Sequence, residues 1–180
     1  MTLLETLNLS GNKLSGSLRG QIDNLGSLSN LDLSSNNFVG DLPAELGNLS
    51  NLKYLSLADN ALFGSIPTYF NHLIDLEELY LSNNNLDGDI GAVSSMRKLE
   101  WIALHDNQFT GGLASFLLLT KLIGIQLHNN RMEEVLPPNW GNLKMLRFLD
   151  LASNDFFGTI AESVVSLHQL GKVQTSFCYY

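Results

Sequence analysis

Leucines recur along this chain in a fixed frame, and one asparagine stands at a constant place after them. Residues 28–38 show the frame Leu-x-x-Leu-x-Leu-x-x-Asn-x-Leu, with phenylalanine at the last place, and residues 52–62 repeat it. The Leu-x-Leu alternation has a period of two, which is typical of a short strand with one buried side. Each unit therefore predicts one short β-strand, followed by a polar residue where the chain turns inward.

The asparagine returns every 23 or 24 residues, at Asn12, Asn36, Asn60, Asn84, Asn107, Asn130 and Asn154. Units in register place their strands side by side as a parallel sheet, with strands about 4.8 Å apart. One unit cannot bury its leucines alone, so the stacked units must share one continuous core. A buried asparagine is costly unless its amide is paired. We expect each amide to bond to backbone groups that the strand no longer pairs and to its neighbour one turn away, which would form a ladder.

The rest of each unit predicts a turn and a short helical segment. A glycine suited to a turn with positive φ follows most of the asparagines, at Gly16, Gly40, Gly64, Gly88, Gly111 and Gly158. An apolar residue comes next, often followed by proline, as in Leu42-Pro43. The remaining segment, such as residues 44–52, is too short for a long helix and suits a tight helical turn on the back of the unit.

The two most complete units, residues 28–52 and 52–76, follow the frame LxxLxLxxNxLxGxIPxxLGNLxxL. This frame resembles the plant-type leucine-rich repeat, and the resemblance covers residues 3 to about 170. It implies an α/β solenoid, a right-handed leucine-rich-repeat superhelix with a concave parallel β-sheet and short 3-10 or helical turns on the convex side. We therefore predict a leucine-rich repeat domain of about seven repeats over residues 1–170 and a C-terminal tail over residues 171–180.

The chain departs from the family pattern at several places. Arrays of this family form ectodomains of receptor-like kinases and receptor-like proteins, and they usually carry cysteine-paired caps. This chain has one cysteine, Cys178, so no intrachain disulfide can form, and the kinase signatures are missing. We expect a fragment, an incomplete gene model or a small stand-alone relative, with Leu4 and Leu7 exposed at an uncapped end. In the sixth unit, Glu133 and Glu134 replace the turn pair.

Charge limits the partners. The net charge is −8 and the pI is near 4.8, so the basic face that a sequence-independent grip on nucleic acid or anionic lipid requires is missing. We predict no nucleic-acid partner, and basic ligands suit the chain better. The sequence shows no signal peptide and no transmembrane stretch. The resemblance implies an extracellular or plasma-membrane ectodomain, with membrane contact only through fusion to a missing transmembrane segment. Localisation and oligomeric state stay open.

The solvent-facing strand positions carry the candidate binding residues. Residues before the first strand leucine or isoleucine run Thr6, Asn30, Tyr54, Glu78, Trp101, Gly124, Phe148, and those between the two apolar strand residues run Asn8, Asp32, Ser56, Tyr80, Ala103, Gln126, Asp150. Aromatic residues gather in the middle and C-terminal units, where exposed rings on a rigid sheet favour binding anchors. The alternative is cross-strand stacking that stabilises the sheet. We predict a ligand-binding set of Tyr54, Glu78, Tyr80, Trp101, His105, Gln126, His128, Phe148 and Asp150.

Two histidines one repeat apart raise a separate question. His105 and His128 each follow the second apolar strand residue, so their side chains should be neighbours and two imidazoles at that spacing could share a metal ion. A third ligand with good geometry is not evident from the sequence, so we predict no metal site. A ligand contact, a pH-sensitive pair and a solvated polar ladder are the other interpretations. His72 and His168 fall in the back segments and predict surface positions.

Motifs for catalysis or for a cofactor are missing: the sequence has no nucleophile motif and no P-loop. We predict a non-catalytic recognition scaffold, without a cofactor, that binds a protein or peptide ligand on its concave face. The alternative is a structural fragment of a larger receptor-like kinase with no independent activity. An enzyme would have to rest on His105 and His128. Asp59, Asp106, Glu133 and Glu134 form an acidic margin, which suits a basic peptide or is only a solvated edge.

Overall fold

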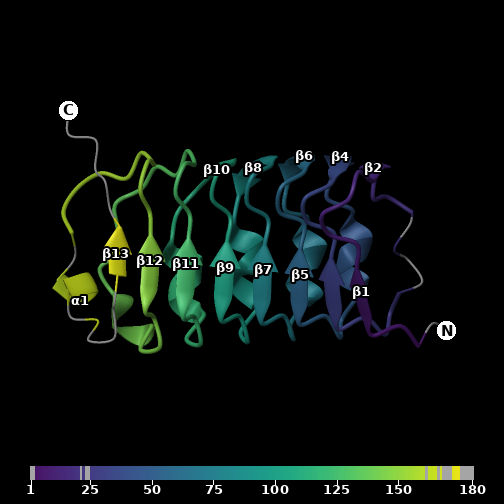
Figure 1. The fold of residues 1–180 in the computed structure, drawn as a ribbon. Helices are drawn as coiled ribbons and strands as arrows, with labels where there is room; N and C mark the ends of the chain where they lie inside the picture. The colour runs from purple at the N-terminus through teal and green to yellow at the C-terminus, as the bar shows by residue number, and fades with distance from the viewer. Residues whose placement is uncertain are drawn as a thin grey trace.

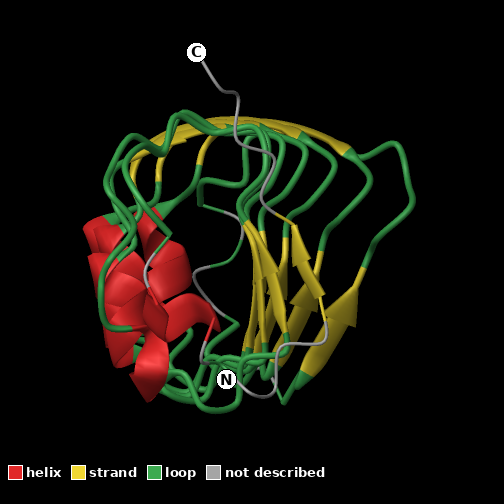
Figure 2. Cartoon of the chain, turned by 90° about the vertical axis from the view of Figure 1, so that its left-hand side faces the viewer, coloured by secondary structure: helices red, strands yellow, loops and turns green. Residues whose placement is uncertain are grey.

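Each repeat unit forms one turn of a solenoid in this computed structural model (Figure 1). The structure describes residues 3–20, 22, 25–160, 162–165, 167 and 172–174. Viewed along the solenoid, the main sheet forms one side, the helical turns form the opposite side, and a second sheet runs along the edge that connects them, at the top of the view (Figure 2). The fold is the predicted α/β solenoid with a concave parallel sheet and short 3-10 turns on the convex side.

An eight-stranded parallel sheet forms the concave side, in the order β1-β3-β5-β7-β9-β11-β12-β13. The strands are β1 (Thr6–Asn8), β3 (Asn30–Asp32), β5 (Tyr54–Ser56), β7 (Glu78–Tyr80), β9 (Trp101–Ala103), β11 (Gly124–Gln126), β12 (Phe148–Asp150) and β13 (Lys172–Gln174). Tyr54 pairs with Glu78 and Glu78 with Trp101, which is the predicted register. Strand β13 pairs with β12, so the sheet continues into the segment predicted as a tail. Its Val173 stands one repeat after Leu149 and pairs with it.

A second parallel sheet, which the sequence analysis did not predict, runs in the order β10-β8-β6-β4-β2. Its strands are β2 (Ser15–Gly16), β4 (Asn37–Asp41), β6 (Ala61–Ser65), β8 (Asn85–Asp89) and β10 (Gln108–Thr110). The six turn glycines all have positive φ, between 75° and 96°, as predicted. In the unit after β10, Glu134 replaces this glycine, and its Oε2 accepts a hydrogen bond from the Leu113 backbone N–H at 2.9 Å. Beyond β10, a single bridge between Val135 and Phe157 takes the place of a further strand pair.

Short 3-10 helices cover the convex side, opposite the main sheet (Figure 2). They are η1 (Ala44–Asn48), η2 (Thr68–His72), η3 (Gly91–Ser95), η4 (Ala114–Leu118) and η5 (Trp140–Asn142), and a short α1 (Glu162–Val165) follows η5. Pro43 and Pro67 directly precede η1 and η2 with extended φ and ψ. Each 3-10 helix directs one large apolar side chain inward, in the column Leu46, Phe70, Val93, Phe116, Trp140, and all five are 0% exposed.

The core is a stack of such columns that runs the length of the solenoid. The first apolar strand position gives Leu31, Leu55, Leu79, Ile102, Ile125 and Leu149, all 0–1% exposed. At the N-terminal strand, Leu4 is 41% exposed, whereas Leu7 is half-buried and packs against the core. The described part of the chain contains no helix that is long and apolar enough to span a membrane.

The asparagines bond to backbone groups as predicted, and these bonds join successive coils; among the described residues they run to the backbone of the neighbouring coil and not to its asparagine. The Nδ2 of Asn84 lies 3.0 Å from the Leu57 carbonyl of the preceding coil and 3.2 Å from the Leu81 and Ser82 carbonyls of its own coil. Its Oδ1 accepts the Leu62 backbone N–H of the preceding coil at 3.0 Å. The same pattern recurs at Asn36, Asn60, Asn107 and Asn130. Every buried amide thus pairs with backbone that the strands leave open.

Candidate ligand-binding site

The four aromatic residues of the predicted site form two ring pairs on the concave sheet. The Tyr54 and Tyr80 rings, on neighbouring strands β5 and β7, have centroids 5.4 Å apart and are tilted by 42°. The Trp101 and Phe148 rings stack with centroids 6.0 Å apart and an interplanar angle of 22°. All four side chains are half-buried, so each ring is in contact with the protein on one side and remains accessible to solvent.

Gly124 explains how Trp101 and Phe148 meet although a strand lies between them. Its strand β11 separates β9 from β12, and Gly124 is in register with both aromatic residues. A side chain at this position would collide with the indole, because a Cβ on Gly124 would lie 2.3 Å from Trp101 Cε3 and Cζ3. The Trp101 and Phe148 rings can therefore stack because Gly124, between them in the sheet, has no side chain. The sequence analysis placed Gly124 in this row but did not assign it that role.

Glu78 supports the tyrosine pair. The Tyr80 hydroxyl donates a hydrogen bond to Glu78 Oε2 at 2.5 Å. Burial raises the pKa of Tyr80, and the hydrogen bond and negative charge of Glu78 raise it further. Burial also raises the pKa of Tyr54, together with the charge of Asp32. Both phenols thus keep their protons well into the alkaline range.

This pair predicts a loss of stability in alkaline solution. The folded chain retains two phenol protons that the unfolded chain releases above about pH 10. The stability that these groups contribute is therefore complete below that pH and is lost as the pH rises further. We expect the thermal midpoint of the Tyr54→Phe/Tyr80→Phe variant to fall less across this rise than that of the wild type, measured by circular dichroism. Equal falls in the two proteins would contradict the assignment.

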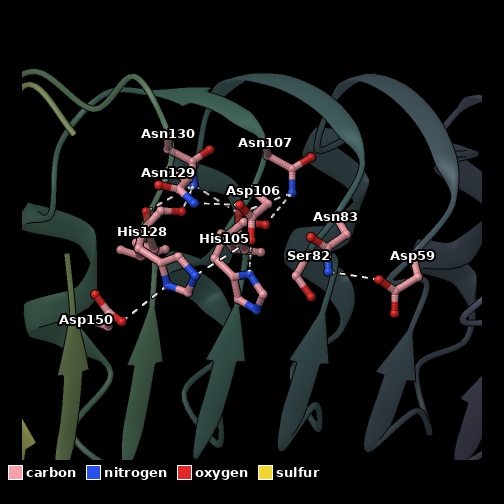
Figure 3. Close-up of polar contacts among 12 residues, drawn as sticks. Asp59, Ser82, Asn83, His105, Asp106, Asn107, His128, Asn129, Asn130 and Asp150 are labelled. Carbon is pink, nitrogen blue, oxygen red and sulfur yellow. Dashed lines mark hydrogen bonds and ion pairs between the residues drawn. The ribbon is translucent and has the colours of Figure 1, made fainter. Parts of the chain in front are cut away.

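His105, Asp106 and His128 form a polar cluster at the carboxyl ends of β9 and β11 (Figure 3). The two imidazoles stack with centroids 4.3 Å apart and an interplanar angle of 9°. Asp106 Oδ2 lies 2.6 Å from His105 Nδ1 and 3.6 Å from His128 Nε2. Partial burial alone would raise the pKa of Asp106, but hydrogen bonds from Asn129 and His105 and the two histidine charges outweigh it and hold this pKa below its ordinary value.

The backbone just before each ladder asparagine places this cluster. From Asn36 onward, the residues there have left-handed φ between 52° and 56°: Ser35, Asp59, Asn83, Asp106, Asn129 and Ser153. Asn, Asp and Ser tolerate this conformation better than branched residues do. Their side chains bond across coils, Asn83 Nδ2 to Asp59 Oδ1 at 2.8 Å and Asn129 Nδ2 to Asp106 Oδ1 at 2.6 Å (Figure 3). The sequence analysis missed this second ladder, although a recurring Ser, Asp or Asn directly before the ladder asparagine was its signal.

The remaining predicted site residues differ in exposure. Gln126 is half-buried on β11, next to Asp150 in register. Asp150 is only 7% exposed, its Oδ1 accepts the Ala152 backbone N–H at 3.1 Å, and its Oδ2 lies 3.3 Å from His128 Nδ1. Asp150 therefore holds both the loop at Ala152 and the His128 ring in place. Of the other histidines, His72 is exposed on η2, as predicted, and His168 lies outside the described residues, as does Cys178.

The acidic margin does not form one continuous patch. Asp59 and Asp106 bond to asparagines at the ends of the concave strands. Glu134 instead bonds to the Leu113 backbone N–H at the turn that follows β10 of the second sheet. A ligand on the concave face would therefore meet Asp59 and Asp106, while Glu134 serves the connection between two coils.

Models of known protein families match most of this solenoid. Residues 50–109 match the family described as leucine rich repeat, and residues 3–25 and 27–49 match single leucine rich repeats. These matches together cover more than half of the chain. The chain therefore belongs to the leucine-rich repeat family. No curated protein matches it.

Solved structures of plant receptors are similar to the chain. The ectodomain of the Arabidopsis thaliana receptor kinase GASSHO1/SCHENGEN3, in complex with CASPARIAN STRIP INTEGRITY FACTOR 2, is 34% identical with a TM-score of 0.86, over 92% of this chain and 20% of that one. The Arabidopsis receptor kinase HAESA, in complex with the peptide hormone IDA and the co-receptor SERK1, is 30% identical with a TM-score of 0.92, over 96% and 29%. The PEPR1–AtPEP1 structure is 34% identical with a TM-score of 0.86, over 96% and 24%. The repeats are thus of the plant type, and the chain spans less than a third of each of these chains.

Proposed function

We propose that the concave face of this chain binds a peptide or protein ligand and performs no chemistry on it. The observation that carries the proposal is the pair of aromatic contacts, Tyr54 with Tyr80 and Trp101 with Phe148, on solvent-facing positions of a rigid sheet. Aromatic anchors of this kind dominate binding energy in protein interfaces. The similar structures of the GASSHO1/SCHENGEN3 ectodomain and of the receptor kinase HAESA were solved with a partner bound, which supports the same use of the fold here.

The proposed contact set has an apolar part and a polar part. Its members are Tyr54, Glu78, Tyr80, Trp101, His105, Gln126, His128 and Phe148, with Asp150 holding His128 from within. The stacked rings would receive an apolar or aromatic side chain. Glu78 and Asp106 would attract a basic group, in keeping with the net charge of −8. The ligand that fits best is therefore an extended peptide with both apolar and basic residues.

A random peptide library displayed on phage tests this proposal, with the purified chain as the target. Peptides selected on the wild type should bind Trp101→Ala about 30-fold more weakly or worse, because a lost anchor costs about 2 kcal/mol. Tyr69→Ala is the matched control, since Tyr69 is 55% exposed on the convex η2. Its affinity should equal that of the wild type.

Gly124→Ala gives a second test that removes no chemical group from the face. A Cβ there would displace the Trp101 indole and separate it from Phe148, so affinity should fall while circular dichroism stays unchanged. Undiminished binding by both Gly124→Ala and Trp101→Ala would place the ligand elsewhere. If every selected peptide bound the wild type and Trp101→Ala with equal affinity, the proposal would be wrong.

A second candidate function is favoured by the length comparison. The chain covers only 20–29% of the three similar receptor chains, so it would act as a structural section of a larger receptor without activity of its own. Transcript sequence flanking the codons for Met1 and Tyr180 tests this alternative. Further repeats, a membrane segment or a kinase encoded on either side would support it. An upstream in-frame stop codon before Met1, together with a stop codon directly after Tyr180, would overturn it.

A further inference from the structure

We propose that His105, Asp106 and His128 form a binding site for Zn²⁺ or a chemically similar divalent transition metal. The donor atoms are His105 Nδ1, Asp106 Oδ2 and His128 Nε2, and one such atom from each residue lies within 4.8 Å of the others. Two imidazole nitrogens and one carboxylate oxygen are a donor set that suits zinc, nickel, copper and cobalt. Metal binding at this cluster does not require a bound peptide.

The spacing of the donors fits a single ion. Ligand atoms that bind one zinc ion at about 2.0–2.2 Å lie roughly 3.3 Å apart in a tetrahedron. Asp106 Oδ2 lies 2.6 Å from His105 Nδ1 and 3.6 Å from His128 Nε2, so these distances bracket that value. The stacked rings bring both nitrogens to the same carboxylate (Figure 3). Because a metal ion lies in the plane of each imidazole that binds it, one of the two stacked rings would have to turn out of the stack when the ion binds.

Asp106 is held in place for this role. Its backbone has φ of 56°, the left-handed conformation shared by the residue before each ladder asparagine. Asn129 Nδ2 donates to Asp106 Oδ1 at 2.6 Å, which leaves Oδ2 directed at the two imidazoles. The carboxylate is 36% exposed and the His105 and His128 side chains are 20% and 26% exposed, so an ion can reach the cluster from solvent.

The far side of His128 supplies a second, independent observation. Its Nδ1 is buried and makes no hydrogen bond to any described residue, yet it lies 3.3 Å from the Asp150 Oδ2. Asp150 is itself 7% exposed. A carboxylate behind the second ring nitrogen is the usual support of a metal-binding histidine, because it fixes the proton on that nitrogen and leaves the other free for the metal. In the metal-bound form, a proton on Nδ1 would be held by a hydrogen bond to Asp150, and Nε2, which lies 3.6 Å from Asp106 Oδ2, would be free for the ion.

Three protein donors leave one position of a tetrahedral site open. Water would fill it in the free protein. The donor set is poor in oxygen, so Ca²⁺ and Mg²⁺ would not bind in place of zinc. The sequence analysis found the two histidines but not the third donor, because Asp106 follows His105 directly and reaches the cluster only through its left-handed backbone.

Isothermal titration of the untagged chain with Zn²⁺ tests the proposal, together with visible absorption of the Co²⁺-loaded chain. We expect one bound ion per chain, and at least about 100-fold weaker binding by His105→Gln and by His128→Gln, since each removes a donor atom. Asp150→Asn should weaken binding about 10- to 100-fold through its effect on His128. Ca²⁺ should give no heat of binding.

His72→Gln is the matched control, because His72 is an exposed histidine on the convex η2 and should leave zinc affinity unchanged. Circular dichroism of each variant establishes that the solenoid is intact. Wild-type chain that binds no stoichiometric zinc would overturn the proposal. So would equal affinity in the wild type and the His105→Gln/His128→Gln double variant, because the ion would then bind elsewhere.

Discussion

Replacement of Asn84 by alanine is expected to lower the free energy of unfolding by about 2–4 kcal/mol. The side chain is 8% exposed, accepts the Leu62 N–H and donates to the carbonyls of Leu57, Leu81 and Ser82. Alanine would leave the buried Leu62 N–H without a partner, which costs about 1–3 kcal/mol. The three carbonyls would each lose one hydrogen bond but keep another, from Asn60 Nδ2, Asn107 Nδ2 and the Asp59 N–H. Urea denaturation followed by circular dichroism measures the loss.

Asn85→Ala is the matched control, because the neighbouring Asn85 is exposed on β8. Its effect should stay within about 0.5 kcal/mol. Hydrogen exchange adds a local readout, since the Leu62 amide should exchange faster in Asn84→Ala than in the wild type. If the two asparagine variants were equally stable, the ladder would not be a main source of stability.

Trp140→Ala is expected to lower the free energy of unfolding by about 3–5 kcal/mol. Trp140 is 0% exposed and ends the convex column that also contains Phe70 and Phe116. Truncation to alanine removes the largest side chain of this column and leaves a cavity between η4 and η5. Thermal or urea denaturation would measure the effect.

Trp140→Phe is the matched comparison and should cost within about 1 kcal/mol. Phenylalanine fills the equivalent positions 70 and 116. The change also removes Nε1, which is buried and has no hydrogen-bond partner among the described residues. Because an unpaired buried donor is destabilising, its removal offsets part of the packing energy that the smaller side chain loses. A phenylalanine variant as unstable as the alanine variant would show that the indole itself, and not apolar volume, is required.

The periodicity of the sequence predicted the main sheet because one apolar frame fixes both burial and register. Leu31, Leu55 and Leu79 recur at a constant interval, and the structure pairs them directly. The second sheet escaped prediction because its strands of two to five residues carry few inward-facing positions, such as Phe38 and Leu62. Their pairing follows from the stacking of coils, which adds backbone partners without any alternation visible in one unit.

The candidate site was predictable in position but not in arrangement. Register alone places Trp101 and Phe148 on the same face. That the rings touch depends on the missing side chain of Gly124, a local absence that no periodic pattern displays. The position of Asp106 beside the histidines depends on a backbone conformation, and the burial of Asp150 next to His128 is a tertiary property that the repeat pattern does not show.

The direction of the asparagine bonds bears on how such an array can change its length. Asn84 serves backbone groups of its own coil and of the coil before it, and Asn107 serves Leu81 and Leu86 in the same backward sense. A duplicated unit would bring an asparagine that pairs with backbone groups of the coil before it. The backbone groups of the duplicated unit would in turn pair with the asparagine of the coil after it. Gain or loss of a whole coil by gene duplication or deletion therefore leaves no internal polar group stranded, whereas a change of a few residues breaks the register of every contact that spans it.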